Sequence, residues 1–153
     1  MVKKLSFMLI CLILVMTIGV QPSNASFQLR IFTAPGSYPV DFSGTQPFID
    51  EKGRTLIPVS GIDKVLQGGI SYEIQGNAVI ITQQGFEYST TVKVEVGSKN
   101  LYKDGGVIEM DSIPVYQDEQ IFIPVRFVAE ALEHYVFWNE ELNEVNVTYN
   151  SVE

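Results

Sequence analysis

The sequence predicts an α+β fold built from two degenerate copies of one strand, hairpin, short helix, hairpin unit. Three observations predict it: apolar runs that alternate as strands do, short helical segments between them, and a register of similar residues that recurs along the chain. Each copy is too small to bury its own apolar face. We therefore expect the two copies to share one core.

Residues 1–25 have the pattern of a signal peptide. Lys3 and Lys4 form a positive start, an almost unbroken apolar stretch follows, and small residues lead up to a cleavage point between Ala25 and Ser26. We expect cleavage there and a secreted or cell-surface product, which meets the membrane only before cleavage. The alternative is an uncleaved anchor, because the apolar run approaches the roughly 18 residues that a membrane span requires.

Cleavage would leave one domain, residues 26–153. A chain of this length can form an ordinary core without cross-links, and the only cysteine, Cys11, is lost with the signal peptide. The basic residues fall from 10 to 8 against 18 acids, so the net charge becomes −10. Such acidity argues against nucleic acid as a partner, because phosphate backbones reward Lys and Arg.

Strand patterns in the first half are short and are separated by glycine, proline and polar residues. They occupy residues 27–31, 40–42, 55–59, 70–73 and 78–82. Residues 50–53 form a polar hairpin tip before the third of them. Ser60 can cap a short helix, with Asp63 placed as in a capping box, and Gly68-Gly69 should end that helix.

The second half shows the cleanest alternation in the chain, with valines at 92, 94 and 96 against polar neighbours. Further strands are predicted at residues 99–103, 107–110, 135–138 and 145–149. Between them a helix should begin at Pro124, because proline is tolerated only in the first turn of a helix. Arg126 and Glu130 are four positions apart on this helix, so they can pair across one turn.

The two halves, about 38–83 and 105–150, match each other. Leu56-Ile57-Pro58-Val59 corresponds to Phe122-Ile123-Pro124-Val125, and the offset in residue number is 124 − 58 = 66. The same offset pairs Leu66 with Leu132, Tyr72 with Trp138, and Val79 with Val145. A register kept this long indicates duplication of one folding unit.

The second copy resembles the repeated motif of the copper amine oxidase N-terminal, or stalk, domain family. In that family a hairpin ends in a Val/Ile-Pro-Leu/Val-Arg run, a short helix carries Glu-Ala-Leu, and a Val-x-Trp-Asp/Asn strand follows. The positions that carry the motif and its repeat are Pro58, Pro124, Arg126, Glu130, Leu132 and Trp138. The resemblance covers roughly residues 27–149. It implies an antiparallel sheet wrapped around short helices, in a non-catalytic module of exported bacterial proteins.

The first copy departs from the motif at three positions. Ser60 stands in place of Arg126, Lys64 in place of Glu130, and Tyr72 in place of Trp138. The pairing of Arg126 with Glu130 therefore has no counterpart there. A role that needs both copies to present the same surface is not expected.

No set of catalytic, cofactor-binding or metal-binding residues is apparent, so we expect no enzyme activity, cofactor or metal. After cleavage the chain keeps one histidine, His134, and no cysteine, too few for a usual copper or zinc site. We expect His134 to be partly exposed at a helix end. The acidic runs, such as residues 50–51 and 118–119, lack the spacing of a calcium loop and are interpreted as solvated turns.

The sequence thus favours an exported structural or interaction module at the cell envelope. Its partner would be a protein or another envelope component, and a homo-oligomer is one form of this prediction. Arg126 and Glu130 are expected to brace their helix, and Trp138 to pack in the core or at its edge. The alternative is a cell-wall protein that binds glycan or peptide through surface tyrosines and Trp138.

Overall fold

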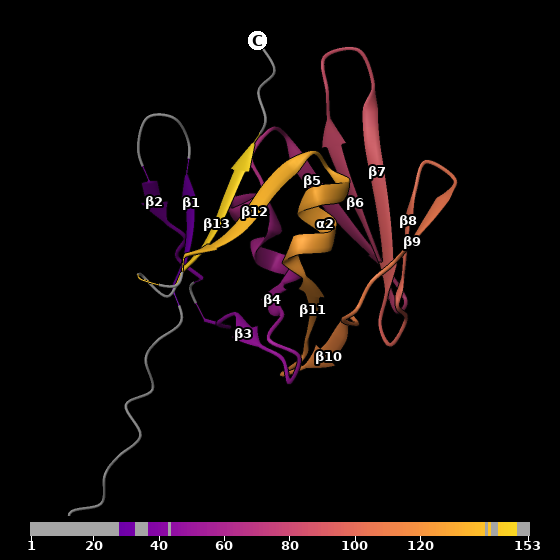
Figure 1. Ribbon diagram of the computed structural model, residues 1–153. Helices are drawn as coiled ribbons and strands as arrows, with labels where there is room; N and C mark the ends of the chain where they lie inside the picture. The colour runs from indigo at the N-terminus through magenta and orange to yellow at the C-terminus, as the bar shows by residue number, and fades with distance from the viewer. Residues whose placement is uncertain (1–27, 33–36, 43, 140, 142–143, 150–153) are drawn as a thin grey trace, which may run out of the picture.

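The computed structural model describes residues 28–32, 37–42, 44–139, 141 and 144–149 (Figure 1). The predicted signal peptide and its cleavage point at Ala25–Ser26 lie outside these residues. The described chain is mostly antiparallel sheet with two short α-helices, so the α+β class is confirmed. The strands form three sheets, where the family resemblance implied one.

The three sheets are built from strands of two to seven residues. The first sheet has the order β12 (His134–Asn139), β13 (Glu144–Tyr149), β1 (Gln28–Phe32), β2 (Ser37–Pro39). The second has the order β10 (Val115–Gln117), β11 (Gln120–Pro124), β4 (Thr55–Pro58), β3 (Phe48–Ile49). The third has the order β5 (Ile70–Gln75), β6 (Ala78–Gln84), β7 (Ser89–Glu95), β8 (Asn100–Lys103), β9 (Gly106–Glu109).

One strand pair departs from the antiparallel expectation. β1 runs parallel to β13, with Leu29 opposite Val145 and Ile31 opposite Val147. Parallel strands need a long connection, and here almost the whole described chain lies between the two strands. The pair therefore brings the beginning and the end of the described chain together.

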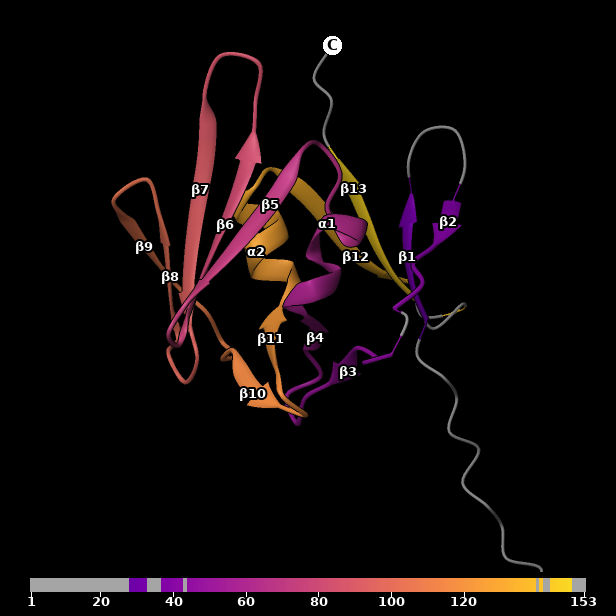
Figure 2. The ribbon, with the colours of Figure 1, turned by 180° about the vertical axis from the view of Figure 1, so that it is seen from behind.

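The longer helix, α2 (Val125–Ala131), begins directly after Pro124, as predicted. The shorter helix, α1 (Ile62–Val65), begins differently from the prediction (Figure 2). A 3₁₀ turn over Val59–Gly61 precedes it, and Gly61, which makes no side-chain cap, stands at its N-cap. Ser60 lies within that turn and its hydroxyl donates to Gln120 instead, so the predicted capping box is wrong.

Both helices lie between the five-stranded sheet and the β12–β13 pair (Figures 1 and 2). A single cluster of buried apolar residues fills the space, and it draws on both halves of the chain. Its fully buried members include Ile57, Leu66, Val79, Ile123, Val128 and Leu132. Since the burial of such side chains is the main stabilising contribution to folding, the two halves stabilise each other.

Phe42 also joins this core, although residues 40–42 were predicted to form a strand. The strand β2 ends at Pro39, and Phe42 is 6% exposed. Its ring lies against Gly61, so close that a Cβ atom there would be 2.6 Å from the ring carbon Cε1. Packing of the ring over the 3₁₀ turn, rather than strand pairing, decides the conformation of this segment.

Candidate functional site

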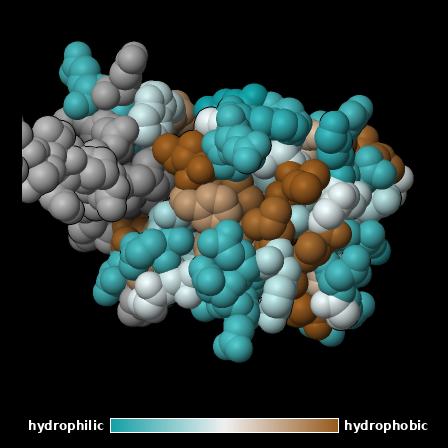
Figure 3. Space-filling view, turned by 90° about the horizontal axis from the view of Figure 1, so that it is seen from below, coloured by the Kyte–Doolittle hydropathy of each residue, from teal (hydrophilic) through white to brown (hydrophobic). Residues whose placement is uncertain are grey.

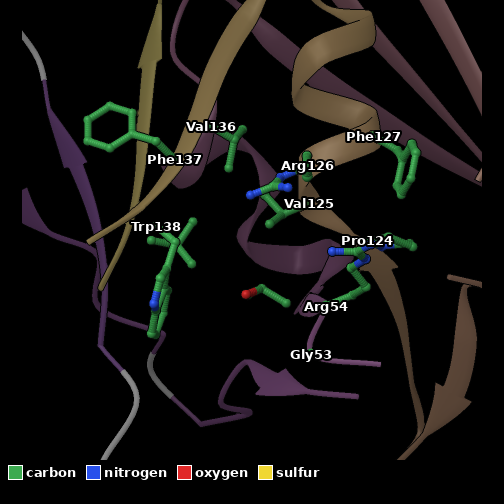
Figure 4. Close-up of a pocket in the computed structure, with 11 residues that line it drawn as sticks. Gly53, Arg54, Pro124, Val125, Arg126, Phe127, Val136, Phe137 and Trp138 are labelled. Carbon is green, nitrogen blue, oxygen red and sulfur yellow. The ribbon is translucent and has the colours of Figure 1, made fainter. Parts of the chain in front are cut away.

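A pocket containing two arginines lies where the β3–β4 hairpin, the start of α2 and strand β12 meet (Figure 4). Its volume is about 70 Å³, and residues 53–55, 124–127, 136–138 and 145 line it. We call it the arginine pocket. Figure 4 shows the guanidinium groups of Arg54 and Arg126 on the same side of this space, with the ring of Trp138 across from them.

Arg54 reaches the pocket from the base of the β3–β4 hairpin. Its Nε donates to Asp111 Oδ1 at 2.9 Å, and its Nη2 forms an ion pair with Oδ2 of the same carboxylate. These hydrogen bonds lower the pKa of Asp111 and raise the pKa of Arg54. Both groups are well exposed, so the bond orients the guanidinium more than it stabilises the fold.

Asp50 holds the hairpin that carries Arg54. Its Oδ1 accepts hydrogen bonds from the backbone N–H groups of Lys52 (2.9 Å) and Arg54 (2.8 Å), and its Oδ2 accepts one from the Ser112 hydroxyl (2.6 Å). Burial acts to raise the pKa of Asp50, but these hydrogen bonds outweigh it and lower the pKa. Asp50 thus accepts hydrogen bonds that hold the hairpin, and the prediction that it is only a solvated turn charge is wrong.

Arg126 and Glu130 both lie on α2 with exposed side chains. Among the ion pairs of the described residues, none joins these two side chains. Arg126 instead lines the arginine pocket. No ion pair in the described structure therefore supports the prediction that these two residues brace the helix.

The remaining motif residues divide between the core and the pocket wall. Leu132 is fully buried, and Pro58 and Pro124 are buried in the paired strands β4 and β11. Trp138 is 41% exposed on β12, so it lies at the edge of the core. Its partial exposure leaves part of the ring accessible on the wall of the arginine pocket.

A second pocket, of about 380 Å³, lies between strand β5 and the β10–β11 hairpin. Tyr72 and Ile74 line it from β5, and Tyr116 and Gln120 from the hairpin. The rest of the lining is mixed, with apolar Val59, Val96 and Ile121 beside polar Ser60, Asn77 and Glu119. We call it the tyrosine pocket. The exposed fractions are 39% for Tyr72 and 65% for Tyr116, so part of each ring is accessible to a ligand.

The two pockets are related by the offset at which the two halves of the sequence match. Arg54 of the arginine pocket corresponds to Gln120 of the tyrosine pocket (120 − 54 = 66). In the opposite direction, Arg126 of the arginine pocket corresponds to Ser60 of the tyrosine pocket (126 − 60 = 66). Each pocket thus combines a hairpin from one half with a helix start and a strand from the other.

Apolar side chains are not confined to the core. Viewed from below, they form a band that crosses the face between hydrophilic side chains (Figure 3). Among the described residues the large apolar side chains that are exposed include Ile74, Val107, Tyr116, Tyr135, Phe137 and Trp138. Single exposed apolar residues are normal on a protein surface, so this list by itself assigns no partner.

His134 is buried, with 3% of its surface exposed, so its predicted partial exposure is wrong. Its Nδ1 lies 2.8 Å from the carbonyl oxygen of Leu132, and its Nε2 lies 3.2 Å from that of Gln67. The ring of Tyr149 covers it at a centroid distance of 5.0 Å. Burial lowers the pKa of His134, although the two carbonyl groups act to raise it.

Within the described residues, no three His, Cys, Asp or Glu side chains are close enough together to hold a metal ion. None of the described helices has the length and apolar character needed to cross a membrane.

The described chain is thus a mostly antiparallel α+β domain around two short helices, with two pockets where its halves meet. The chain matches the family described as the copper amine oxidase N-terminal domain over residues 37–147, which is more than half of its length. The protein therefore belongs to that family, and the resemblance found in the sequence is confirmed. No curated protein and no solved structure matched the chain significantly.

Proposed function

We propose that this protein is an exported, non-catalytic structural or interaction module of the cell envelope, built from two copies of one folding unit. The pairing of β4 with β11 carries the two-copy part of the proposal. Ile57 lies opposite Ile123, and 123 − 57 = 66, the offset at which the two halves match. Pro58 is opposite Phe122, and Leu56 is opposite Pro124. Replacing each residue by its counterpart in the other half therefore gives the same set of pairs.

Family membership supports a stalk-like module. The matched family is the N-terminal domain of copper amine oxidases, which is not their catalytic domain. Histidine is the side chain best suited to general acid–base chemistry near neutral pH. The chain has one histidine, and both of its ring nitrogens lie beside backbone carbonyl groups rather than lining either pocket.

Export rests on the signal-peptide pattern of residues 1–25. The test is mass spectrometry of the protein recovered from the medium and from the membrane fraction of an expressing bacterium. We expect the mature form to begin at Ser26. A chain that keeps its apolar segment and stays in the membrane fraction would support the anchor and contradict cleavage.

Interaction through sheet edges is the mode that the fold supports best. Strand β5 is an edge strand of the five-stranded sheet. It is joined to β6 by a two-residue turn, so Gln75 and Ala78 on either side of that turn form a hydrogen-bonded pair. Every second residue of β5 then directs its backbone N–H and C=O groups away from β6. Tyr72 and Ile74 are in that position. An edge with unpaired backbone groups and apolar side chains can accept another strand.

Light scattering after size-exclusion chromatography tests self-association. We expect a dimer or larger species at high protein concentration, and Ile74→Lys should shift it toward the monomer because it places a charge on the edge. Thr91→Lys, on the central strand β7, is the matched control and should have no such effect. A strict monomer for the unmodified protein would count against self-association.

A second candidate is binding of cell-wall glycan or peptide through exposed aromatic rings. Two observations favour it: Tyr72 and Tyr116 share one pocket, and Trp138 borders the other. Sedimentation with purified cell wall would test it. Loss of sedimentation in Trp138→Ala, with an unchanged circular dichroism spectrum, would favour wall binding over the structural role.

A further inference from the structure

We propose that the arginine pocket binds the carboxylate of a small ligand with an apolar body, such as the C-terminal carboxylate of a peptide that ends in a small apolar residue. The inference uses the proposed two-copy arrangement for comparison, but the site itself rests on Arg54, Arg126 and the wall around them. The formal net charge of the chain is −8, so an anion would be attracted only where positive groups are concentrated.

The tyrosine pocket shows how the corresponding positions pair when neither side chain is charged. The counterparts of Arg54 and Arg126 are Gln120 and Ser60, and the Ser60 hydroxyl donates to the Gln120 side-chain oxygen at 3.0 Å. These two groups satisfy each other. Two guanidinium groups cannot, because both carry only donors and the same charge.

Asp111 compensates for only part of this charge. Its carboxylate accepts hydrogen bonds from Nε and Nη2 of Arg54. The two N–H donors of Nη1 remain available to a ligand. No ion pair among the described residues involves Arg126. An incoming carboxylate would place an anion between the two arginines, and the planar guanidinium fork matches the two oxygens of a carboxylate.

The rest of the pocket selects the body of the ligand. Val125, Val136 and Val145 contribute apolar surface, and Trp138 adds an aromatic wall. No lining side chain is a carboxylate or an amide, so the many hydroxyl groups of a sugar acid would find few acceptors. The volume of about 70 Å³ is the space open to the centre of a water molecule, and one buried water needs about 10–15 Å³ on that measure. The pocket therefore has room for a carboxylate and a small apolar group.

Nuclear magnetic resonance titration of the purified protein tests the proposal with three probes. N-acetylalanine carries the carboxylate and the small apolar body, N-acetylalaninamide lacks the charge, and glucuronate carries the charge on a sugar. We expect saturable shifts of the Trp138 indole N–H and the Arg126 backbone amide with N-acetylalanine, and much weaker binding of the other two probes.

Substitutions assign the binding to the two arginines. Arg126→Gln should weaken N-acetylalanine binding about tenfold or more, because a charge-assisted hydrogen bond is lost. Arg126→Lys should recover only part of that loss, since it keeps the charge without the fork. Asp111→Asn should strengthen binding, because it removes the negative charge that competes for Arg54 and keeps a side-chain oxygen that can accept from its Nε. Lys99→Gln, which removes a positive charge from an exposed residue outside the pocket, is the matched control.

Absence of saturable shifts, equal binding of the amide, or unchanged affinity in Arg126→Gln would overturn the proposal. Tighter binding of glucuronate than of N-acetylalanine would overturn the assignment of an apolar body. None of these results depends on export or self-association, so a failure here is distinguishable from a failure of the proposed envelope role.

Discussion

Ile57 and Ile123 lie directly opposite each other in the antiparallel pair β4–β11, and both are fully buried. Their residue numbers differ by 123 − 57 = 66, so they occupy the same position in the two proposed copies. If the halves are related by a two-fold axis, this pair lies at the axis. The centre of the protein is then a contact between one residue and its own counterpart.

Such a pair predicts equal and coupled effects of substitution. Ile57→Ala and Ile123→Ala should each lower the free energy of unfolding by about 2–5 kcal/mol, because each opens a cavity in the packed core. The double variant should lose less than the sum, since the two side chains are neighbours and share one cavity. Urea denaturation measures all three. Ile74→Ala, at an exposed position, is the control; strongly unequal losses would contradict the symmetric pairing.

Much of the local structure was predictable because its signals lie close together in the sequence. Gly68 and Gly69 adopt positive φ angles of 94° and 72°, so the sequence correctly marked a turn there. The prediction that these glycines end the helix is wrong, because α1 ends at Val65 with Leu66 as its C-cap. Pro124 marks the start of α2 for the reason given from sequence, its missing N–H donor. The hairpin tip at residues 50–53 was likewise found from its polar and glycine residues.

The contacts that build the candidate site were not predictable in the same way. Arg54 and Asp111 are 57 residues apart, and Asp50 and Ser112 are 62 apart. No short sequence spacing therefore predicts either contact. The burial of His134 depends on Gln67, which only the fold brings beside it. The register between the two halves could have suggested that both contribute to each pocket. It could not have shown that the side chains point into one space.

The contact between Ser112 and Asp50 predicts a specific loss of stability. Ser112→Ala removes a buried hydroxyl that donates to the Asp50 carboxylate, and should lower the free energy of unfolding by about 1–3 kcal/mol. Urea denaturation measures the loss. Ser98→Ala is a matched control, because its hydroxyl only accepts an exposed hydrogen bond from the Asn100 amide. An unchanged midpoint for Ser112→Ala would contradict the anchoring role of Asp50.

The single histidine predicts how stability depends on pH near neutrality. Because folding lowers the pKa of His134, the unfolded chain binds more protons than the folded chain as the pH falls through the ordinary value of about 6.5. The stability is therefore fully present above that value and is progressively lost below it. Urea midpoints measured between about pH 7.5 and 5.5 should fall with pH. With no other histidine in the chain, His134→Gln should flatten this slope; a slope that persists would contradict the assignment.

The close approach of Phe42 to Gly61 predicts that this glycine cannot be enlarged without cost. Gly61 is buried, and a Cβ atom there would lie 2.6 Å and 2.8 Å from two carbons of the Phe42 ring. Gly61→Ala should therefore displace the ring and lower the free energy of unfolding by about 1–3 kcal/mol, as overpacking does in other cores. Phe42→Leu removes part of the ring, so the same alanine should cost less in that background. Equal costs in both backgrounds, measured by urea denaturation, would show that the alanine acts on the backbone of the 3₁₀ turn rather than through contact with the ring.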